Sequence, residues 1–347
     1  MKSSNIGGQA VMEGIMMKNG DKYAVAVRKP DQEIEVKVEE YKGIIKNKKI
    51  KSLPVVRGVF SFIDSLVLGM KTLMYSADFF MEDEEMEPGR VEKALDKATK
   101  GKADSVIMGG TVAFSVVMAV VIFMMLPYFL AGVLRHVISS ETLIALAEGV
   151  LRLVIFAGYI LLISRMKDIQ RVFMYHGAEH KCINCIEHGL ELNTENVMGS
   201  SKQHKRCGTS FLLFVMIVSV IFFIFIRVDS PVWRVVIRLL LIPVIAGVSY
   251  EFIRLAGRSE NKVVEFLSKP GLWMQNMTTR EPDESMVEVA IASVEAVFDW
   301  KAYLAENFNW ENPREDMVSP APADMADPTG QADPAEAEGS SPAEAGA

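Results

Sequence analysis

The sequence has few of the residues and motifs on which common soluble architectures depend. Only three of its 347 residues are cysteines, too few and too close together for the disulfide framework of a secreted domain. No glycine-rich motif of the Walker or Rossmann type is present, so no nucleotide-binding loop is predicted. No repeat of fixed period and no apolar signal segment near Met1 is visible, and we expect neither a solenoid nor secretory targeting.

Charged side chains are also missing from one long stretch. Half of the residues are apolar and the mean hydropathy is +0.20, unusual for a soluble protein. Residues 105–134 contain no charge, and at about 1.5 Å per residue this length exceeds a hydrocarbon core of about 30 Å. Further apolar stretches follow at 143–164, 210–226 and 232–250. We predict a mainly α-helical, polytopic membrane protein with about four transmembrane helices within residues 105–251.

The distribution of lysine and arginine predicts the orientation. The connection after the second stretch is rich in both, whereas those after the first and third carry only Arg135 and Arg227. Since cytoplasmic loops are enriched in positive charge, we expect the loop at 165–209 to be cytoplasmic. Four spans then put both termini in the cytoplasm.

The segment before the membrane domain is predicted to contain a small β element. Within residues 1–54, Tyr23, Val25 and Val27 alternate with other residues, and Ile34 and Val36 do so after a turn. A period of two predicts a half-buried hairpin. We expect this element to be cytoplasmic.

Residues 55–104 combine an interrupted apolar helix with an acidic linker, and a run of lysines precedes them. Two placements fit this helix. It lies on the cytoplasmic leaflet, where each lysine gains about 1 kcal/mol from anionic head groups, or it packs on the hairpin. Residues 252–310 are predicted to form cytoplasmic helices. The tail at 311–347 is acidic and rich in Pro, Ala, Ser and Gly, which predicts disorder.

Three of the five histidines lie in "YHGAEHKCINCIEHG", residues 175–189. His176, Glu179 and His180 form H-x-x-E-H, the arrangement of inverted zinc peptidases. Two histidines four residues apart share a helix face, and the glutamate can act as general base on a metal-activated water. The pattern predicts His176 and His180 as metal ligands and Glu179 as the catalytic base. The alternative is a pair of surface histidines without a metal.

The cysteines of the same segment do not fit that helix face. On a straight helix Cys185 points opposite to His176, and Cys182 is also badly placed. They contribute only if Cys182, Cys185 and His188 form a second site, which we favour less than ligands from another segment.

The segment "KQHKRCGTSF" offers such ligands. It places His204 and Cys207 just ahead of the third apolar stretch, where neighbouring cations and a helix N-terminus favour the thiolate. We predict a site of His176 and His180 with His204, Cys207 or both, and these donors suit a divalent metal, zinc best. A fourth position left to water makes such a site catalytic, and four protein ligands make it structural.

Four charges lie inside the predicted spans: Glu148 and Arg152 in the second, Arg234 and Arg238 in the fourth. An unpaired charge at this depth costs at least about 2.5 kcal/mol. We therefore expect an ion pair between Glu148 and Arg238, with a further partner for Arg152. The alternative is a substrate or ion pathway.

Other polar residues are predicted to reach the same side of the membrane as the histidine segment. They are Glu13 in "GGQAVMEG", Glu251 and Arg280. Glu251 is expected to face the histidine loop as an additional carboxylate ligand. For the glycines and Arg280, ordinary turns and a helix-start salt bridge explain the residues equally well.

Five segments together resemble the YqhQ-like family of bacterial integral membrane proteins, over residues 7–297. They are "GGQAVMEGIMMKN", "YHGAEHK", "HKRCGTSF", "RLLLIPVIAGVSYEFIRLAGR" and "PGLWMQNMTTREPDE". The resemblance implies a multi-pass protein of the bacterial cell membrane and a metal-dependent enzyme. Its motif positions here are His176, Glu179, His180, Cys185, His204 and Cys207.

Two functions fit these observations. One is a metal-dependent hydrolase acting at the cytoplasmic face of the membrane; the other is a non-catalytic scaffold or assembly factor with a structural metal. A transporter ranks third because only two spans carry charge. The lipid bilayer and its anionic head groups are the predicted partners, and nothing indicates binding of nucleic acid.

Overall fold

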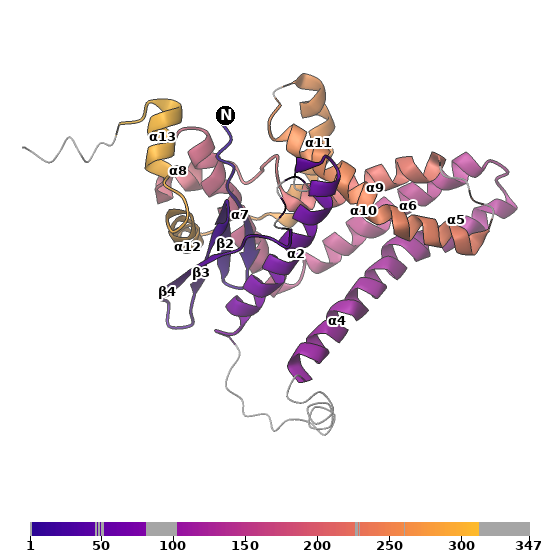
Figure 1. Ribbon diagram of the computed structural model, residues 1–347, viewed down its shortest axis with the longest axis horizontal. Helices are drawn as coiled ribbons and strands as arrows, with labels where there is room; N and C mark the ends of the chain where they lie inside the picture. The colour runs from indigo at the N-terminus through magenta and orange to yellow at the C-terminus, as the bar shows by residue number, and fades with distance from the viewer. Residues whose placement is uncertain are drawn as a thin grey trace, which may run out of the picture. The chain divides into compact units, whose positions relative to one another are not determined.

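The computed structural model describes residues 2–80 and 103–311, apart from positions 46, 48, 50, 51, 226, 227, 229 and 260. The predicted acidic linker and nearly all of the predicted acidic tail lie outside these residues. The described part is mainly helical, with one small sheet (Figure 1).

The sheet is an antiparallel meander of four strands in the order β1-β2-β3-β4. The strands are β1 (Gly7–Val11), β2 (Gly14–Asn19), β3 (Lys22–Arg28) and β4 (Ile34–Glu40). The predicted hairpin is confirmed as β3 and β4, in which Ala24 pairs with Val38. The strands β1 and β2 add to it. Asn19 and Lys22 close the β2–β3 turn, and Gly20 there has a φ of 61°, which glycine adopts without steric cost.

Helices cover both faces of the sheet. Ile15, Met17 and Ala26 share a buried core with α7 (Lys167–Glu187) and α12 (Glu284–Glu295). Met16 and Val25, which alternate with them, pack instead with Leu68 of α2 (Val56–Ala77). The period of two thus gives the sheet two apolar faces. The predicted apolar helix at 55–104 is α2, and it packs on the sheet.

The remaining long helices correspond to the four predicted apolar stretches. They are α4 (Ala103–Val120), continued by η1 (Val121–Met125), α5 (Leu126–Val133) and η2 (Leu134–His136); α6 (Glu141–Ile163); α9 (Gly208–Phe225); and α10 (Pro231–Ala256). Including α2, five helices are long and apolar enough to cross a membrane. The prediction of a mainly helical chain with several helices able to cross a membrane is confirmed.

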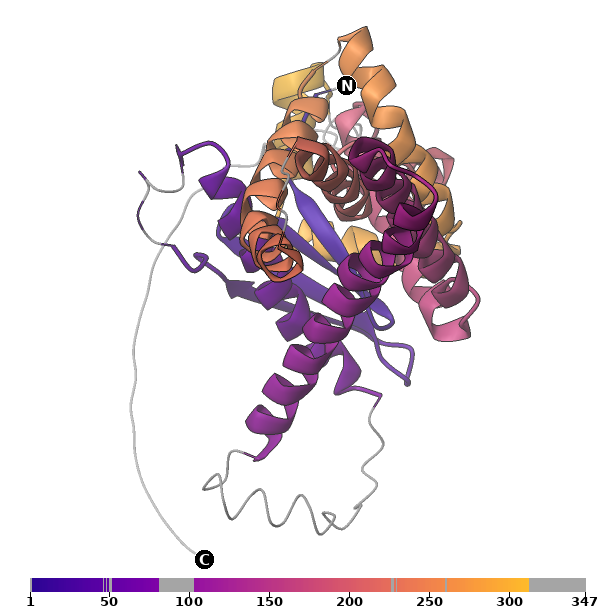
Figure 2. The same cartoon turned by 90° about the vertical axis from the view of Figure 1, so that its right-hand side faces the viewer.

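The α4 segment stands apart from the other helices. None of its window of highest hydropathy is buried, and both views show its first turns clear of the other helices (Figures 1 and 2). The π-helical turn η1 precedes Pro127, after which α5 packs along α6. A π-turn and a proline are two of the features at which helices change direction.

Shorter helices complete the described chain. They are α8 (Thr194–Gly199), α11 (Lys262–Thr278) and α13 (Trp300–Phe308). The side chains of Asn193, Asn261, Asp283 and Asp299 accept hydrogen bonds from the first turns of α8, α11, α12 and α13, so each of these helices has an N-cap.

Candidate metal centre

Helix α7 carries the histidine motif and packs tightly against the segment that follows α11. A Cβ atom at Gly177 would lie 2.0 Å from the backbone oxygen of Arg280, so only glycine allows this approach. The backbone N–H of Arg280 also donates to the oxygen of Phe173 on α7, over 2.9 Å. The end of α11 is thereby held beside His176.

The structure brings three predicted donors together. One ligand atom each from His176, His180 and Cys207 lies within 4.8 Å of the other two, and Nε2 of His176 is 3.2 Å from the Cys207 sulfur. Donors of one tetrahedral zinc ion lie roughly 3.3 to 3.8 Å apart, because Zn–N is about 2.0 Å and Zn–S about 2.3 Å. Small side-chain rotations therefore suffice for the three atoms to share one ion.

Both imidazoles of this cluster are oriented by backbone carbonyls. Nδ1 of His176 donates to the oxygen of Thr278 over 2.9 Å, and Nδ1 of His180 donates to the oxygen of Lys202 over 2.7 Å. In its neutral form, a ring whose Nδ1 carries the proton presents the Nε2 lone pair to a metal. A carbonyl that holds one ring nitrogen and so orients the other is characteristic of metal-ligating histidines.

The electrostatics of the cluster favour a thiolate. Burial alone would raise the pKa of Cys207, but the attraction of His176 and His180 holds it well below its usual value. Burial alone would lower the pKa of His176, but the Cys207 sulfur raises it to about 9. The Thr209 backbone N–H, in the first turn of α9, lies 3.4 Å from the Cys207 sulfur. The thiolate is the form of cysteine that binds metal.

His204 lies next to the cluster and faces another residue. Its Nε2 is 3.4 Å from the carboxylate of Glu187, and its backbone is held by both polar ends of the Gln275 side chain. Arg206 pairs with the same carboxylate, which also accepts from the Ser4 backbone N–H over 2.7 Å. These contacts fix the segment that carries Cys207.

Glu179 is buried between α7 and the first strand. A Cβ atom at Gly8 would lie 2.9 Å from Cγ of Glu179, and the Gly8 backbone hydrogen-bonds to this carboxyl group. Burial raises the pKa of Glu179, while His180 and His176 act in the opposite direction. A carboxyl group with a raised pKa beside two imidazoles suits a general base. The segment "GGQAVMEG" therefore contributes to the surroundings of the site through Gly8.

The other two cysteines belong to the hydrophobic core. Cys182 and Cys185 are fully buried among the apolar residues shared by α7 and α12. Burial raises the pKa of both thiols, that of Cys185 to about 12. Within the described ranges, the cluster of His176, His180 and Cys207 is the one group of three or more potential donors. A second site on Cys182, Cys185 and His188 finds no support.

Two carboxylates expected near the histidines have other partners. Glu251 pairs with Arg57 and accepts from the Val55 backbone N–H, so it ties α10 to the start of α2. The expectation that it joins the histidines as a ligand is wrong. Glu13 pairs with Arg171 near the start of α7.

The charges within the apolar helices form one buried group, and the predicted ion pair is present. Both terminal guanidinium nitrogens of Arg238 donate to Glu148, over 2.6 and 2.8 Å. Arg152 donates to Glu148 over 2.8 Å and to Ser219 of α9 over 2.7 Å. The guanidinium carbon of Arg238 lies 4.6 Å from the ring centre of Phe223. The group links α6, α9 and α10.

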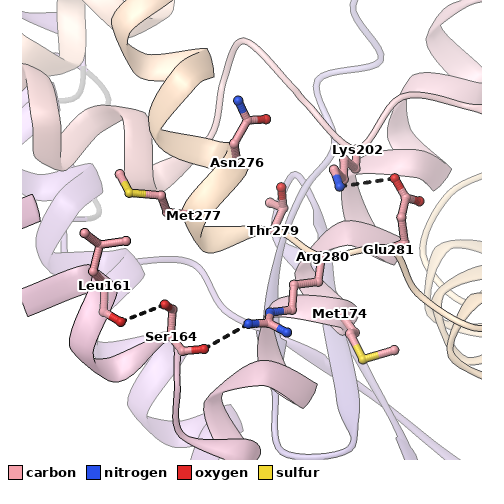
Figure 3. A pocket seen from close by; sticks show the side chains of 9 residues that line it. All are labelled: Leu161, Ser164, Met174, Lys202, Asn276, Met277, Thr279, Arg280 and Glu281. Carbon is pink, nitrogen blue, oxygen red and sulfur yellow. Dashed lines mark hydrogen bonds and ion pairs between the residues drawn. The ribbon is translucent and has the colours of Figure 1, made fainter.

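A cavity of about 580 Å³ is lined by nine residues, some of them from the segments that orient the histidines (Figure 3). Its lining comes from α6, α7, the segment before α9, and α11 with the residues after it: Leu161, Ser164, Met174, Lys202, Asn276, Met277, Thr279, Arg280 and Glu281. Lys202 is the residue whose carbonyl holds His180, and Thr279 follows the residue whose carbonyl holds His176. Cavity and cluster therefore share backbone walls.

A family model described as a protein of unknown function, DUF1385, matches residues 53–300. The chain belongs to this family. It is 35% identical over 307 residues to "Uncharacterized protein YqhQ" of Bacillus subtilis (strain 168), a match that covers 87% of this chain and 94% of that protein. No solved structure matches. The family resemblance predicted from the motifs is confirmed, and neither description names a substrate, a metal or a membrane.

Proposed function

We propose that this DUF1385 member is a membrane-embedded, metal-dependent hydrolase whose site lies at the cytoplasmic surface. The observation that carries the proposal is the cluster of His176, His180 and Cys207, in which each imidazole has Nδ1 on a backbone carbonyl and Nε2 available. Mixed imidazole and thiolate donors suit zinc. Such a preorganised donor set is hard to explain as a pair of solvated histidines.

The chain's own residues would divide the work in a hydrolytic reaction. His176, His180 and Cys207 would hold a divalent ion, which supplies a water nucleophile near neutral pH. Glu179, buried and next to His180 in the chain, would accept the proton of the attacking water and return it to the leaving group. His176 is the partly exposed member of the cluster, so it marks the side from which water and substrate enter.

Contacts of the sheet with α7 and α12 support the proposal that all three lie on one side of the membrane. The sheet packs on both α7 and α12: Tyr175 contacts Glu13, and Ser293 donates to the Ile15 and Ala24 carbonyls. Segments that contact each other outside the membrane lie on the same side of it. The chain must therefore cross the membrane an even number of times between the sheet and α7, and between α7 and α12. Between the sheet and α7 lie α2, the α4–α5 segment and α6, and α2 has the lowest hydropathy of the five candidates, 1.2. We infer four spans, with α2 outside the membrane core.

Helix α2 then fits a position on the membrane surface. Its apolar side chains Leu66, Val67 and Leu73 are exposed, whereas Leu68 and Thr72 are buried. A helix with one apolar face on protein and another exposed is suited to the head-group boundary. The lysine-rich segment before α2 favours an anionic, cytoplasmic leaflet.

Metal content tests the proposal. We expect about one zinc ion per chain in detergent-purified protein by elemental mass spectrometry. His176→Ala, His180→Ala and Cys207→Ser should lose it, and Glu179→Gln should keep it. The scaffold alternative requires four protein ligands, so it predicts that His204→Gln also loses the metal. If His204→Gln keeps the metal, an open, catalytic site is favoured. If the wild type binds no metal under any loading condition, both the hydrolase and the scaffold with a structural metal are refuted.

A further inference from the structure

The cavity differs from an ordinary surface hollow in the composition of its walls. Leu161 and Met277 give it an apolar side, and Lys202 and Arg280 give it a cationic one (Figure 3). Apolar and charged walls in one cavity match a ligand that has both kinds of surface.

The apolar wall belongs to a predicted span. Leu161 lies in the last turn of α6 and is 47% exposed. Ser164 ends this helix, and its carbonyl oxygen accepts from the Arg280 guanidinium over 3.0 Å. With α6 as one of the four proposed spans, the cavity lies at the end of that span, the level at which a lipid's head group would join its tail.

The cationic wall carries more positive than negative charge. Glu281 is its one carboxylate, and it pairs with Lys202 over 3.2 Å and with Lys181 over 3.0 Å. Among the described residues, no carboxylate oxygen lies within the 4.0 Å limit of an ion pair with Arg280, whose bonding partner is the neutral carbonyl of Ser164. Two cations, Lys202 and Arg280, thus line the cavity beside one carboxylate, which Lys202 shares with the buried Lys181. A guanidinium with unused donors binds phosphate oxygens in bidentate fashion.

The position of the cavity relative to the cluster favours a substrate role. The carbonyl of Lys202 holds His180, and the carbonyl of Thr278, just before the lining residue Thr279, holds His176. A head group seated on Lys202 and Arg280 would contact the segments whose carbonyls orient both imidazoles. We propose that this cavity binds the substrate as an amphiphile with a phosphate head group and an apolar chain. The inference deepens the proposed hydrolase and depends on it.

Binding of short-chain amphiphiles to the full-length chain in neutral detergent tests this inference. The probes are dioctanoyl phosphatidic acid and farnesyl phosphate, with dioctanoylglycerol and inorganic phosphate as controls. We expect both phosphorylated amphiphiles to bind at least about tenfold more tightly than either control, because head and chain are both recognised. Tighter binding of dioctanoyl phosphatidic acid would indicate a glycerolipid substrate, and tighter binding of farnesyl phosphate would indicate a polyprenyl substrate. If dioctanoylglycerol, which lacks the phosphate, binds as tightly as the phosphorylated probes, the inference is overturned.

Variants of the cationic wall locate the site. Arg280→Gln should weaken binding of the phosphorylated probes about tenfold, the effect of losing a charged hydrogen bond, and Arg280→Lys should recover part of it. Arg258→Gln removes an exposed arginine beyond the end of α10 and should leave binding unchanged. An equal loss in Arg258→Gln contradicts the assignment.

Metal content of the same preparations separates this inference from the proposed function. Arg280→Gln should keep the metal of the wild type, since its backbone contacts with α7 persist. If the wild type contains metal but does not bind the phosphorylated amphiphiles, only the assignment of the cavity is refuted. If it binds them but contains no metal, the proposed hydrolase is refuted.

Discussion

The three donors of the cluster lie close together because neighbouring groups orient their side chains. The donors are His176, His180 and Cys207. A backbone carbonyl occupies Nδ1 of both imidazoles, and the segment that carries Cys207 is fixed by its neighbours His204 and Arg206. Both of these contact Glu187, whose side chain is fully buried. The carboxylate of Glu187 therefore positions a donor that it does not touch.

We expect Glu187→Ala to destabilise the fold by about 3 kcal/mol, since removing one partner leaves buried charge and hydrogen-bond donors uncompensated. Thermal unfolding in detergent, followed by circular dichroism, measures this. Glu306→Ala, an exposed position on α13, is the matched control and should change stability by less than about 0.5 kcal/mol.

The same variant has a predictable pH dependence. Burial alone would raise the pKa of Glu187, but His204 and Arg206 lower it below its ordinary value. A carboxyl group with a depressed pKa stabilises the fold above its unfolded pKa of about 4.3 and loses that contribution as the pH falls through its folded pKa. Wild type and Glu187→Ala should therefore converge in stability in acid. A difference that is constant from pH 7 to acid contradicts this account.

At the scale of elements, the distance between α7 and the end of α11 decides whether the cluster can bind. A side chain at Gly177 would collide with the Arg280 carbonyl at 2.0 Å, and the carbonyl of Thr278, which orients His176, lies in the same segment. Gly177→Ala must push these elements apart. We expect metal affinity to fall by about 10-fold to 100-fold, the usual effect of losing a group that orients a metal ligand.

Metal titration of the purified variants checks this expectation. Gly158→Ala is the control, because Gly158 also lies inside a helix and a Cβ there meets nothing within 4 Å; it should bind metal as the wild type does. Wild-type affinity in Gly177→Ala shows that the close approach does not matter.

Helices α6, α9 and α10 are joined by a group with two guanidiniums and one carboxylate. Glu148→Gln leaves Arg152 and Arg238 without a counter-charge and should cost about 3 kcal/mol or more. Arg238→Met leaves a neutral pair of Glu148 and Arg152, so we expect a much smaller loss. Thermal unfolding of the two variants in detergent checks this asymmetry, and equal losses contradict it.

At the scale of the whole molecule, contacts between the sheet, α7 and α12 require an even number of spans between them. We expect a reporter fused to either terminus to lie in the cytoplasm, and one inserted between α5 and α6 to lie outside. Fusions to a cytoplasm-active fluorescent protein and to a periplasm-active phosphatase measure this. Termini on opposite sides would mean that α2 crosses the membrane.

Four features could be predicted from the amino-acid sequence alone: the apolar helices, the β3–β4 hairpin, the H-x-x-E-H face and the Glu148–Arg238 pair. Each depends on spacing along one element, or on the cost of burying an unpaired charge. The alternation of Tyr23, Val25 and Val27 could be seen directly, whereas β1 and β2 contain glycines and methionines that weaken the pattern.

Contacts between residues of distant segments became known only from the three-dimensional structure. Sequence spacing could not choose between His204 and Cys207, because the choice depends on how Glu187 and Gln275 hold the segment between α8 and α9. It also could not pair Glu251 with Arg57, 194 positions away. Such contacts depend on packing between elements, and local patterns carry no information about it.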